Sequence, residues 1–341
     1  MSEANRPSGG ERTRQRVAVD VHLDAAARRP ALARDVARGF AAVPKELPPK
    51  WFYDETGSLL FEDITQLPEY YPTRREREIL VDHGAEIAAA SAADTLVELG
   101  SGMGEKTALL LDALAGGGRL RRFVALDVSE AALRESCRRL ARERPGLEVR
   151  GVAADFELDL DRIPRGGRRL VALLGGTIGN FRPAQRRALL GGLAARLEPG
   201  ESFLLGVDLV KDRSRLLAAY DDAAGVTAAF NRNVLSVINR ELGGEFDLDA
   251  FEHEVCFDES HEWIEMWLRS TRRQRIRIAA LGCTVELEAG EGIRTEISAK
   301  FRLDRLAGEL AGAGLRAVET WTDRAGDFAL TLSRPAAEAP V

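Results

Sequence analysis

The sequence predicts an α/β fold built on a doubly wound, mostly parallel sheet. Three strand-like runs, at residues 96–99, 123–126 and 149–154, support this prediction, because helix-forming segments separate them as crossovers between parallel strands require. Each run ends in residues that suit a nucleotide: a turn with three glycines at 100–104, then Asp127, then Asp155 beside Phe156. Ligands of such sheets bind beyond the carboxyl ends of the strands, so we expect a nucleotide site there.

The three strand ends favour S-adenosylmethionine as the cofactor. Gly100 can adopt a positive φ and let the backbone approach a ligand, and Asp127 can accept hydrogen bonds from ribose hydroxyls. Asp155 and Phe156 can bind the exocyclic amine of adenine and cover its face. The glycine spacing is G-x-G-x-G, whereas the dinucleotide fingerprint is G-x-G-x-x-G, so we predict S-adenosylmethionine rather than NAD. A tight turn in an ordinary α/β domain is the alternative.

The remaining pattern predicts a Class I (Rossmann-like) S-adenosylmethionine-dependent methyltransferase sheet with an inserted α+β substrate-binding domain. The alternation continues with a strand at 170–174, a helix at 183–197 and a strand at 201–208. After Lys211 it changes to a helix at 216–242 and alternating runs within 252–289, which indicate an antiparallel sheet. A helix at 300–312 and strands at 317–321 and 327–332 then complete the first sheet.

These elements divide the chain into five predicted segments. They are a disordered polar tail at 1–16, an N-terminal segment at 17–74 that packs with the substrate-binding domain, the methyltransferase domain at 75–210, the inserted substrate-binding domain at 211–299, and a C-terminal helix with strands at 300–341.

Composition excludes several classes of protein. The formal net charge is -6 and the sequence pI is about 5.5, which argues against a nucleic-acid partner, because such binding needs a dense basic surface. Three cysteines and four histidines are scattered without the spacing of metal ligands, so no metal site is expected. No signal sequence and no apolar run long enough for a membrane span occur, so we expect a cytoplasmic protein without a membrane partner.

The segment after the fourth strand is a candidate site for the methyl acceptor. Glycines at 175, 176 and 179 permit close approach of a ligand, and the Asn180 amide offers both a donor and an acceptor, which suits the ammonium and carboxylate of an amino acid. A glycine-rich loop with an asparagine that caps the next helix is the alternative.

Five motifs together resemble the histidine Nα-methyltransferases of ergothioneine biosynthesis. They are WFYDETG at 51–57, LPEYYPTR at 67–74, ELGSG at 98–102, GTIGN at 176–180 and IRTEIS at 293–298. The resemblance runs from about Phe40 onward and includes the inserted domain, so it is more specific than a general methyltransferase match. It implies the transfer of three methyl groups from S-adenosylmethionine to the α-amine of L-histidine, which gives hercynine. A monomer is expected.

The resemblance also implies roles for individual residues. In the histidine site these are Tyr53 beside the α-amine as the catalytic residue, Tyr70 on the imidazole, Asn180 and Tyr220 on the carboxylate and amine, Met266 as a wall of the side-chain pocket, and Glu296 with Ser298 as the pair that reads the imidazole. In the cofactor site they are Gly100, Lys106, Asp127, Asp155 and Phe156. Met266 and Phe156 could instead be plain core, and Tyr53 and Tyr220 could be buried structural tyrosines.

Chemistry at these positions predicts little need for a strong base. Methyl transfer requires a neutral amine held about 3 Å from the methyl carbon with water excluded, and an α-amine titrates close to neutral pH. We expect Tyr53 to orient the amine, directly or through a water molecule. Three alternatives stay open: a methyltransferase for another amino acid or small amine, a protein methyltransferase with an open cleft, and an S-adenosylmethionine sensor without activity.

Overall fold

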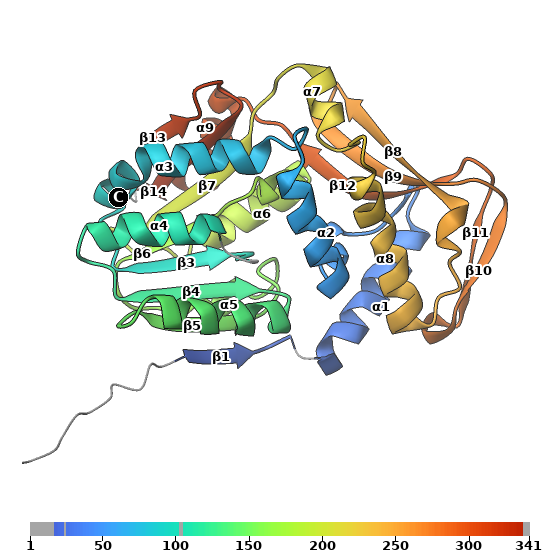
Figure 1. Cartoon of the computed structure of the whole chain (residues 1–341), viewed down its shortest axis with the longest axis horizontal. Helices are drawn as coiled ribbons and strands as arrows, with labels where there is room; N and C mark the ends of the chain where they lie inside the picture. The colour runs from blue at the N-terminus through green and yellow to red at the C-terminus, as the bar shows by residue number, and fades with distance from the viewer. Residues whose placement is uncertain (1–16, 24, 102–104, 337–341) are drawn as a thin grey trace, which may run out of the picture.

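The computed structural model describes residues 17–23, 25–101 and 105–336 of the 341-residue chain. Its strands form an eight-stranded sheet, a four-stranded sheet and a two-stranded sheet, and the larger two lie on opposite sides of the molecule (Figure 1). The predicted disordered tail and part of the glycine turn, at 102–104, lie outside the described residues.

The large sheet has the strand order β1-β5-β4-β3-β6-β7-β14-β13. Its strands are β1 (Val17–Val21), β3 (Thr95–Leu99), β4 (Arg122–Asp127), β5 (Glu148–Ala153), β6 (Arg169–Leu173), β7 (Ser202–Asp208), β13 (Leu315–Thr322) and β14 (Phe328–Pro335). The first six run parallel, and β14 pairs antiparallel with both β7 and β13. The predicted fold class, a parallel Rossmann-like sheet closed by a C-terminal hairpin, is confirmed.

Strand β1 differs from its predicted place. We expected residues 17–74 to pack with the substrate-binding domain, but β1 pairs parallel with β5 and extends the large sheet. Val19 and Val21 pack against the core of that sheet, and Asp20 forms an ion pair of 2.7 Å with Arg150 of the neighbouring strand. The alternating sequence VAVDV is typical of a strand at the edge of a sheet, with one apolar face.

Helices cover both faces of the large sheet. They are α3 (Pro72–Ser91), α4 (Glu105–Gly116) and α5 (Glu130–Glu143) on one face, with α6 (Pro183–Ala194) and α9 (Leu303–Gly312) on the other. Each helix buries its apolar positions against the strands, such as Ile79 of α3 and Leu310 of α9, both of which are fully buried. None of the helices among the described residues has the length and apolarity needed to cross a bilayer.

The four-stranded sheet has the order β2-β12-β9-β8 and belongs to the second apolar core. Its strands are β2 (Lys45–Glu46), β8 (Phe251–Asp258), β9 (Trp263–Ser270) and β12 (Gly292–Ala299), with β10 (Gln274–Ile278) and β11 (Cys283–Leu287) as a separate hairpin. Helix α8 (Val226–Leu242) packs on this sheet together with α1 (Ala25–Ala41), η1 (Pro49–Phe52) and α2 (Glu55–Gln66). The N-terminal segment therefore contributes to both large sheets of the molecule.

The helix predicted at 216–242 is interrupted. It consists of α7 (Arg213–Ala218) and α8, and the loop between them contains Tyr220. The Asp222 carboxylate accepts hydrogen bonds from the backbone N–H groups of Val226 and Thr227, at 2.9 and 2.8 Å, and so caps the start of α8. This cap starts a new helix at Val226. The apolar periodicity of the sequence alone did not reveal the interruption.

Candidate active site

The predicted cofactor residues and the loop that contains Asn180 lie at the carboxyl-terminal edge of the large sheet. The chain runs from β3 to β4 and β5 on one side of β3 and returns to β6 and β7 on the other, so the topological switch point lies between β3 and β6. Ligands of doubly wound sheets bind at this point. Gly100 follows β3, Asp127 ends β4, Asp155 follows β5, and the loop that contains Asn180 follows β6.

Gly100 and Phe156 lie next to each other at this edge. Gly100 has φ of +68°, as expected, and a methyl group in place of its hydrogen would lie 3.7 Å from the Phe156 ring. Phe156 is partly buried, and its ring packs edge-on against Phe181 at a centroid distance of 6.2 Å. One oxygen of Asp127 accepts the backbone N–H of Ser129 at 2.9 Å, which orients the carboxylate at the end of β4.

Asp155 joins the cofactor edge to the N-terminal segment. Its carboxylate accepts hydrogen bonds from the Lys50 ammonium group, at 2.8 Å, and from the Glu157 backbone N–H, at 3.0 Å. Lys50 also lies 3.1 Å from Asp35, and although burial lowers the pKa of Lys50, these two carboxylates outweigh burial and raise it. The side chain predicted to bind adenine is thus already paired with a cation from η1.

Lys106 is held by a carboxylate that the sequence reasoning missed. Its ammonium group donates to Glu76 of α3, whose side chain is fully buried. The backbone N–H of Gly175 lies 2.9 Å from each oxygen of Glu76, so the same carboxylate fixes the loop after β6. Glu76 comes two residues after a family motif, and only its place on a buried helix face could have indicated it.

The residues predicted to bind histidine gather on one face of β12. Glu296 pairs directly with Met266 across β12 and β9, and Ser298 lies two residues further on, so the three side chains share a face. The Ser298 hydroxyl lies 2.7 Å from the Tyr220 hydroxyl, and the rings of Tyr220 and Tyr70 meet edge-on at 6.2 Å.

Tyr53 packs among aromatic side chains of the second apolar core. Its ring contacts Phe61 and Phe230 at centroid distances of 5.6 and 5.5 Å. Burial raises the pKa of Tyr53 well above its usual value, and the charges of Glu296 and Asp127 add to this effect. Tyr53 is therefore within electrostatic range of both predicted sites.

Glu296 is a half-buried carboxylate on this face of β12. Burial raises its pKa to about 7, and the positive charge of Lys300 opposes this effect. Within the described part of the chain, the Glu296 carboxylate accepts no hydrogen bond and forms no ion pair. A side chain of this kind is expensive to bury unless a ligand supplies the missing donor.

The loop that contains Asn180 packs closely on β12. The loop forms the short helix η3 (Thr177–Asn180), and a methyl group on Gly179 would lie only 2.9 Å from the Ala299 carbonyl oxygen. Only glycine permits this approach. Asn180 is thus the last residue of a short helix that is docked on Ala299, the residue after Ser298.

Three further residues support the site and were not predicted from the sequence. The Asn233 amide of α8 donates to the Phe52 carbonyl at 3.2 Å and to Asp54 at 2.7 Å, and so holds the backbone on both sides of Tyr53. Lys300 donates to Ser298 and Tyr220, and Asp208 at the end of β7 pairs with Lys300 at 2.9 Å.

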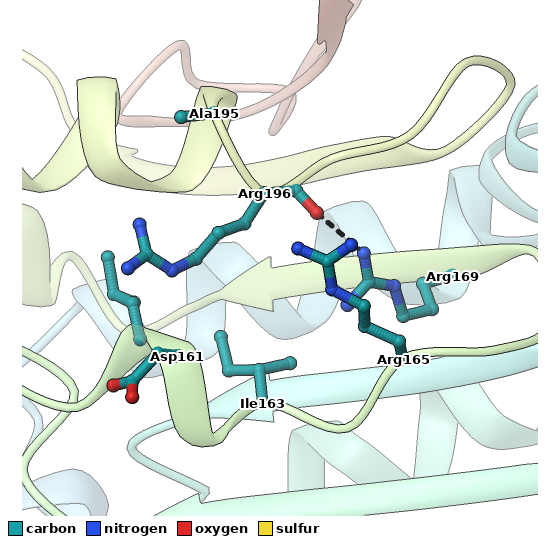
Figure 2. Close-up of a pocket in the computed structure, with 7 residues that line it drawn as sticks. Asp161, Ile163, Arg165, Arg169, Ala195 and Arg196 are labelled. Atoms are coloured by element: carbon teal, nitrogen blue, oxygen red, sulfur yellow. Dashed lines mark hydrogen bonds between the residues drawn. The ribbon is translucent and has the colours of Figure 1, made fainter.

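A cavity of about 320 Å³ lies away from these residues. Arg165, Arg169 and Arg196 line it (Figure 2), and Arg169 is the first residue of β6, so the cavity is at the amino-terminal edge of the sheet. Arg169 donates two hydrogen bonds of 2.6 Å to Glu201 and one of 2.7 Å to the Arg196 carbonyl. Its charge is thus fully matched, which indicates a structural ion pair.

The described residues contain no group of three or more His, Cys, Asp or Glu side chains arranged to hold a metal ion. The strand order, the glycine turn and the two acidic strand ends define the chain as a Class I methyltransferase.

Comparison with known proteins gives the family. Residues 32–335 match the profile of the S-adenosylmethionine-dependent, histidine-specific methyltransferases. The chain is 56% identical to histidine N-alpha-methyltransferase of Mycobacterium tuberculosis over 318 residues, covering 93% of this chain and 99% of that protein. It is 57% identical to the protein of the same name from Mycolicibacterium smegmatis, covering 89% and 94% of the two chains. The chain therefore belongs to the S-adenosylmethionine-dependent histidine-specific methyltransferase family.

A more distant relative is ergothioneine biosynthesis protein 1 of Schizosaccharomyces pombe. It is 33% identical over 226 residues, which cover 63% of this chain and 29% of that longer protein.

Proposed function

We propose that this chain transfers three methyl groups from S-adenosylmethionine to the α-amine of L-histidine and so forms hercynine, a step of ergothioneine biosynthesis. The observation that carries this proposal is Glu296: a carboxylate without a partner among the described residues, opposite Met266 and beside the hydroxyl groups of Ser298 and Tyr220. A neutral imidazole fits this arrangement, because it carries one N–H for a carboxylate and one bare nitrogen for a hydroxyl donor.

The proposed cofactor residues fit S-adenosylmethionine. Asp127 would accept the ribose hydroxyls, Asp155 and Phe156 would bind adenine, and Gly100 leaves room for the backbone to approach. Lys106, held by Glu76, would lie near the carboxylate of the methionine part. When bound, S-adenosylmethionine supplies a methyl group on a positively charged sulfur.

The proposed acceptor residues orient the amine rather than deprotonate it. Burial raises the pKa of Tyr53, Tyr70 and Tyr220 well above 10, so all three remain neutral phenols at physiological pH. A phenol can accept a hydrogen bond from the amine or donate one to the carboxylate, but it cannot act as a strong base. Because the positive sulfur of the bound cofactor disfavours the ammonium form and so lowers the pKa of the α-amine, the neutral amine is accessible without a dedicated base.

Discrimination between amino acids would come from buried polar pairing. Asn180 and Tyr220 would hold the carboxylate and amine that every amino acid shares, whereas Glu296 and Ser298 would read the ring. An amino acid without ring nitrogens leaves Glu296 desolvated and unpaired, which can reduce binding by several orders of magnitude. Met266, which is almost fully buried, would limit the width of the ring pocket.

Two measurements test the proposal. Calorimetric titration of the purified protein with L-histidine, in the presence of S-adenosylhomocysteine, should show one site, and incubation with S-adenosylmethionine should increase the mass of histidine by three methyl groups. Transfer to another amino acid or amine instead would contradict the substrate and leave the methyltransferase class intact. A monomeric state and a cytoplasmic location stay predictions; light scattering tests the first and cell fractionation the second.

A further inference from the structure

Lys300 lies behind the proposed histidine site and touches both hydroxyl groups of that site. It lies directly after β12 and continues the two-residue spacing of Glu296 and Ser298, and its side chain reaches the same side as Ser298. Its ammonium group lies 2.8 Å from the Ser298 hydroxyl and 2.9 Å from the Tyr220 hydroxyl. The Lys300 side chain is 0% exposed, so these contacts are shielded from water.

Counting protons shows what Lys300 does to these hydroxyls. An ammonium group has three donors and no acceptor, and those of Lys300 go to Ser298, Tyr220 and Asp208. Each hydroxyl therefore accepts one hydrogen bond from Lys300. The two hydroxyls are also 2.7 Å apart, so one donates to the other, and one proton is left over. That proton is not used by Lys300, so the hydroxyl pair can offer it to a ligand.

We propose that Lys300 is a positioning residue that leaves the Ser298–Tyr220 hydroxyl pair with one hydrogen-bond donor for the substrate, so that the site selects a ring with a bare nitrogen facing Ser298 and an N–H facing Glu296. The inference rests on the proposed function and adds the basis of its ring selectivity. Lys300 need not touch the substrate, because it acts through the two hydroxyls. A neutral imidazole meets both requirements, whereas a ring with only one nitrogen meets one of them.

Asp208 holds Lys300 in place and supplies a matched control. Its carboxylate binds the ammonium groups of both Lys300 and Lys211 and the hydroxyl of Tyr71. Replacing either lysine by methionine leaves Asp208 with the other lysine and the tyrosine. Lys211 has no contact with Ser298 or Tyr220 among its hydrogen bonds to described residues, which go to Asp208, Tyr71 and the Leu209 carbonyl.

The experiment compares Lys300→Met with Lys211→Met. Calorimetry with S-adenosylhomocysteine present would measure the Kd of L-histidine and of two pyrrolylalanines, each of which replaces one ring nitrogen of histidine by carbon. Lys300→Met should raise the Kd of histidine about 10- to 100-fold, as expected for loss of charge-assisted hydrogen bonds. It should leave the Kd of the pyrrolylalanine whose N–H group faces Glu296 within about threefold, so discrimination between histidine and this ligand collapses.

Lys211→Met should keep the discrimination of the unaltered protein. An unchanged ratio of the two Kd values in Lys300→Met, with S-adenosylhomocysteine still bound normally, would overturn the role of Lys300. Failure of the unaltered protein to bind histidine at all would instead overturn the proposed function, and this inference with it.

A second measurement does not depend on the folding of any variant. The ¹⁵N spectrum of ring-labelled histidine bound to the unaltered protein should show one ring nitrogen with a proton and one without. Two protonated ring nitrogens would contradict the proposal, because a hydroxyl that must donate cannot face an N–H group.

Discussion

The substrate selectivity of the proposed site depends mainly on one side chain, Glu296. Its carboxylate stands among tyrosine rings with no hydrogen-bond donor from the described residues, and burial raises its pKa to about 7. The protein keeps this side chain at a cost in stability. Binding of a ligand that donates to it would recover part of that cost, and a ligand without a donor would not.

Replacing Glu296 by alanine should therefore weaken histidine binding strongly. The variant loses a charge-assisted hydrogen bond in a desolvated site, so the Kd of L-histidine should rise at least 100-fold. Calorimetry measures this directly, and the Kd of S-adenosylhomocysteine serves as the control because the cofactor residues are unaltered. An unchanged Kd for histidine would show that Glu296 does not read the ring.

Replacing Glu296 by glutamine should change how stability depends on pH. The folded pKa of about 7 lies above the ordinary value of 4.5, so the folded protein holds this proton more tightly than the unfolded chain between pH 4.5 and 7. Stability consequently falls as pH rises through this range, and the full cost, at most about 3 kcal/mol, is present above pH 7. Glu296→Gln should be more stable than the unaltered protein at pH 8 and equal to it at pH 4. Urea unfolding without ligands measures the stability of both proteins. The same stability difference between them at pH 4 and at pH 8 would contradict the prediction.

Tyr53 is expected to affect the reaction rate more than binding. Its raised pKa keeps it a neutral phenol that can orient the amine, and Tyr53→Phe removes only the hydroxyl. We expect kcat to fall about 10- to 100-fold while the Kd of histidine stays within about threefold. Steady-state product formation gives kcat, and calorimetry on the same preparation gives the Kd of histidine. Equal losses in binding and turnover would rule out this role.

At the level of elements, the site depends on segments that break regular structure. Tyr220 lies in the interruption between α7 and α8, and Tyr53 lies between η1 and α2. Both loops are fixed by buried polar side chains: Asp222 caps α8, and Asn233 of α8 binds the backbone and side chain around Tyr53. Loops held in this way present side chains with the accuracy of helices and strands.

Asn233→Ala should loosen the loop that contains Tyr53. The substitution removes the amide that donates to both the Phe52 carbonyl and the buried Asp54 carboxylate, so stability should fall by about 1–3 kcal/mol. The rate should fall as well, because Tyr53 loses its fixed position. Urea unfolding and kcat measure the two effects, and Ser236→Ala on the same helix is the control, with stability expected within about 0.5 kcal/mol. Full activity in Asn233→Ala would show that the loop does not need this clamp.

At the level of the whole molecule, the two edges of the large sheet have separate tasks. The carboxyl-terminal edge carries the site, whereas the amino-terminal edge carries the buried ion pair of Arg169 and Glu201 beside the arginine-lined cavity (Figure 2). The site that contains Glu296, a carboxylate without a partner among the described residues, is thus separated from the edge that carries this matched ion pair.

Arg169→Met should therefore destabilise the protein without affecting binding. It leaves the Glu201 carboxylate buried and unpaired with a cation, which costs about 3–5 kcal/mol. Thermal unfolding should show a clearly lower Tm, while the Kd of histidine at a temperature where the variant is folded should not change. Arg165→Met, on the exposed rim of the same cavity, is the control and should change stability by less than about 0.5 kcal/mol.

The fold was largely predictable because its signals are local. Apolar runs that end in glycine or aspartate identify the parallel strands, and the motif residues identify the family. The long-range pairs were not predictable. Strand β1 pairs with β5 at a separation of 132 residues, as in Val17 with Val149, and Glu76 meets Lys106 across two helices. Lys300 was missed although it continues the two-residue alternation of Glu296 and Ser298. The role of a buried lysine depends on the side chains around it, and the sequence does not show which these are.

The position of β14 has a consequence for how the protein is made. This strand, at Phe328–Pro335, lies between β7 and β13, although β7 is complete about 120 residues earlier in the chain. All four strands of the small sheet precede it. The small sheet can therefore close during synthesis while one edge of the large sheet is still open, with the unpaired backbone of β7 exposed to other chains. Aggregation during synthesis, rather than loss of activity, is the expected first effect of changes that weaken β14.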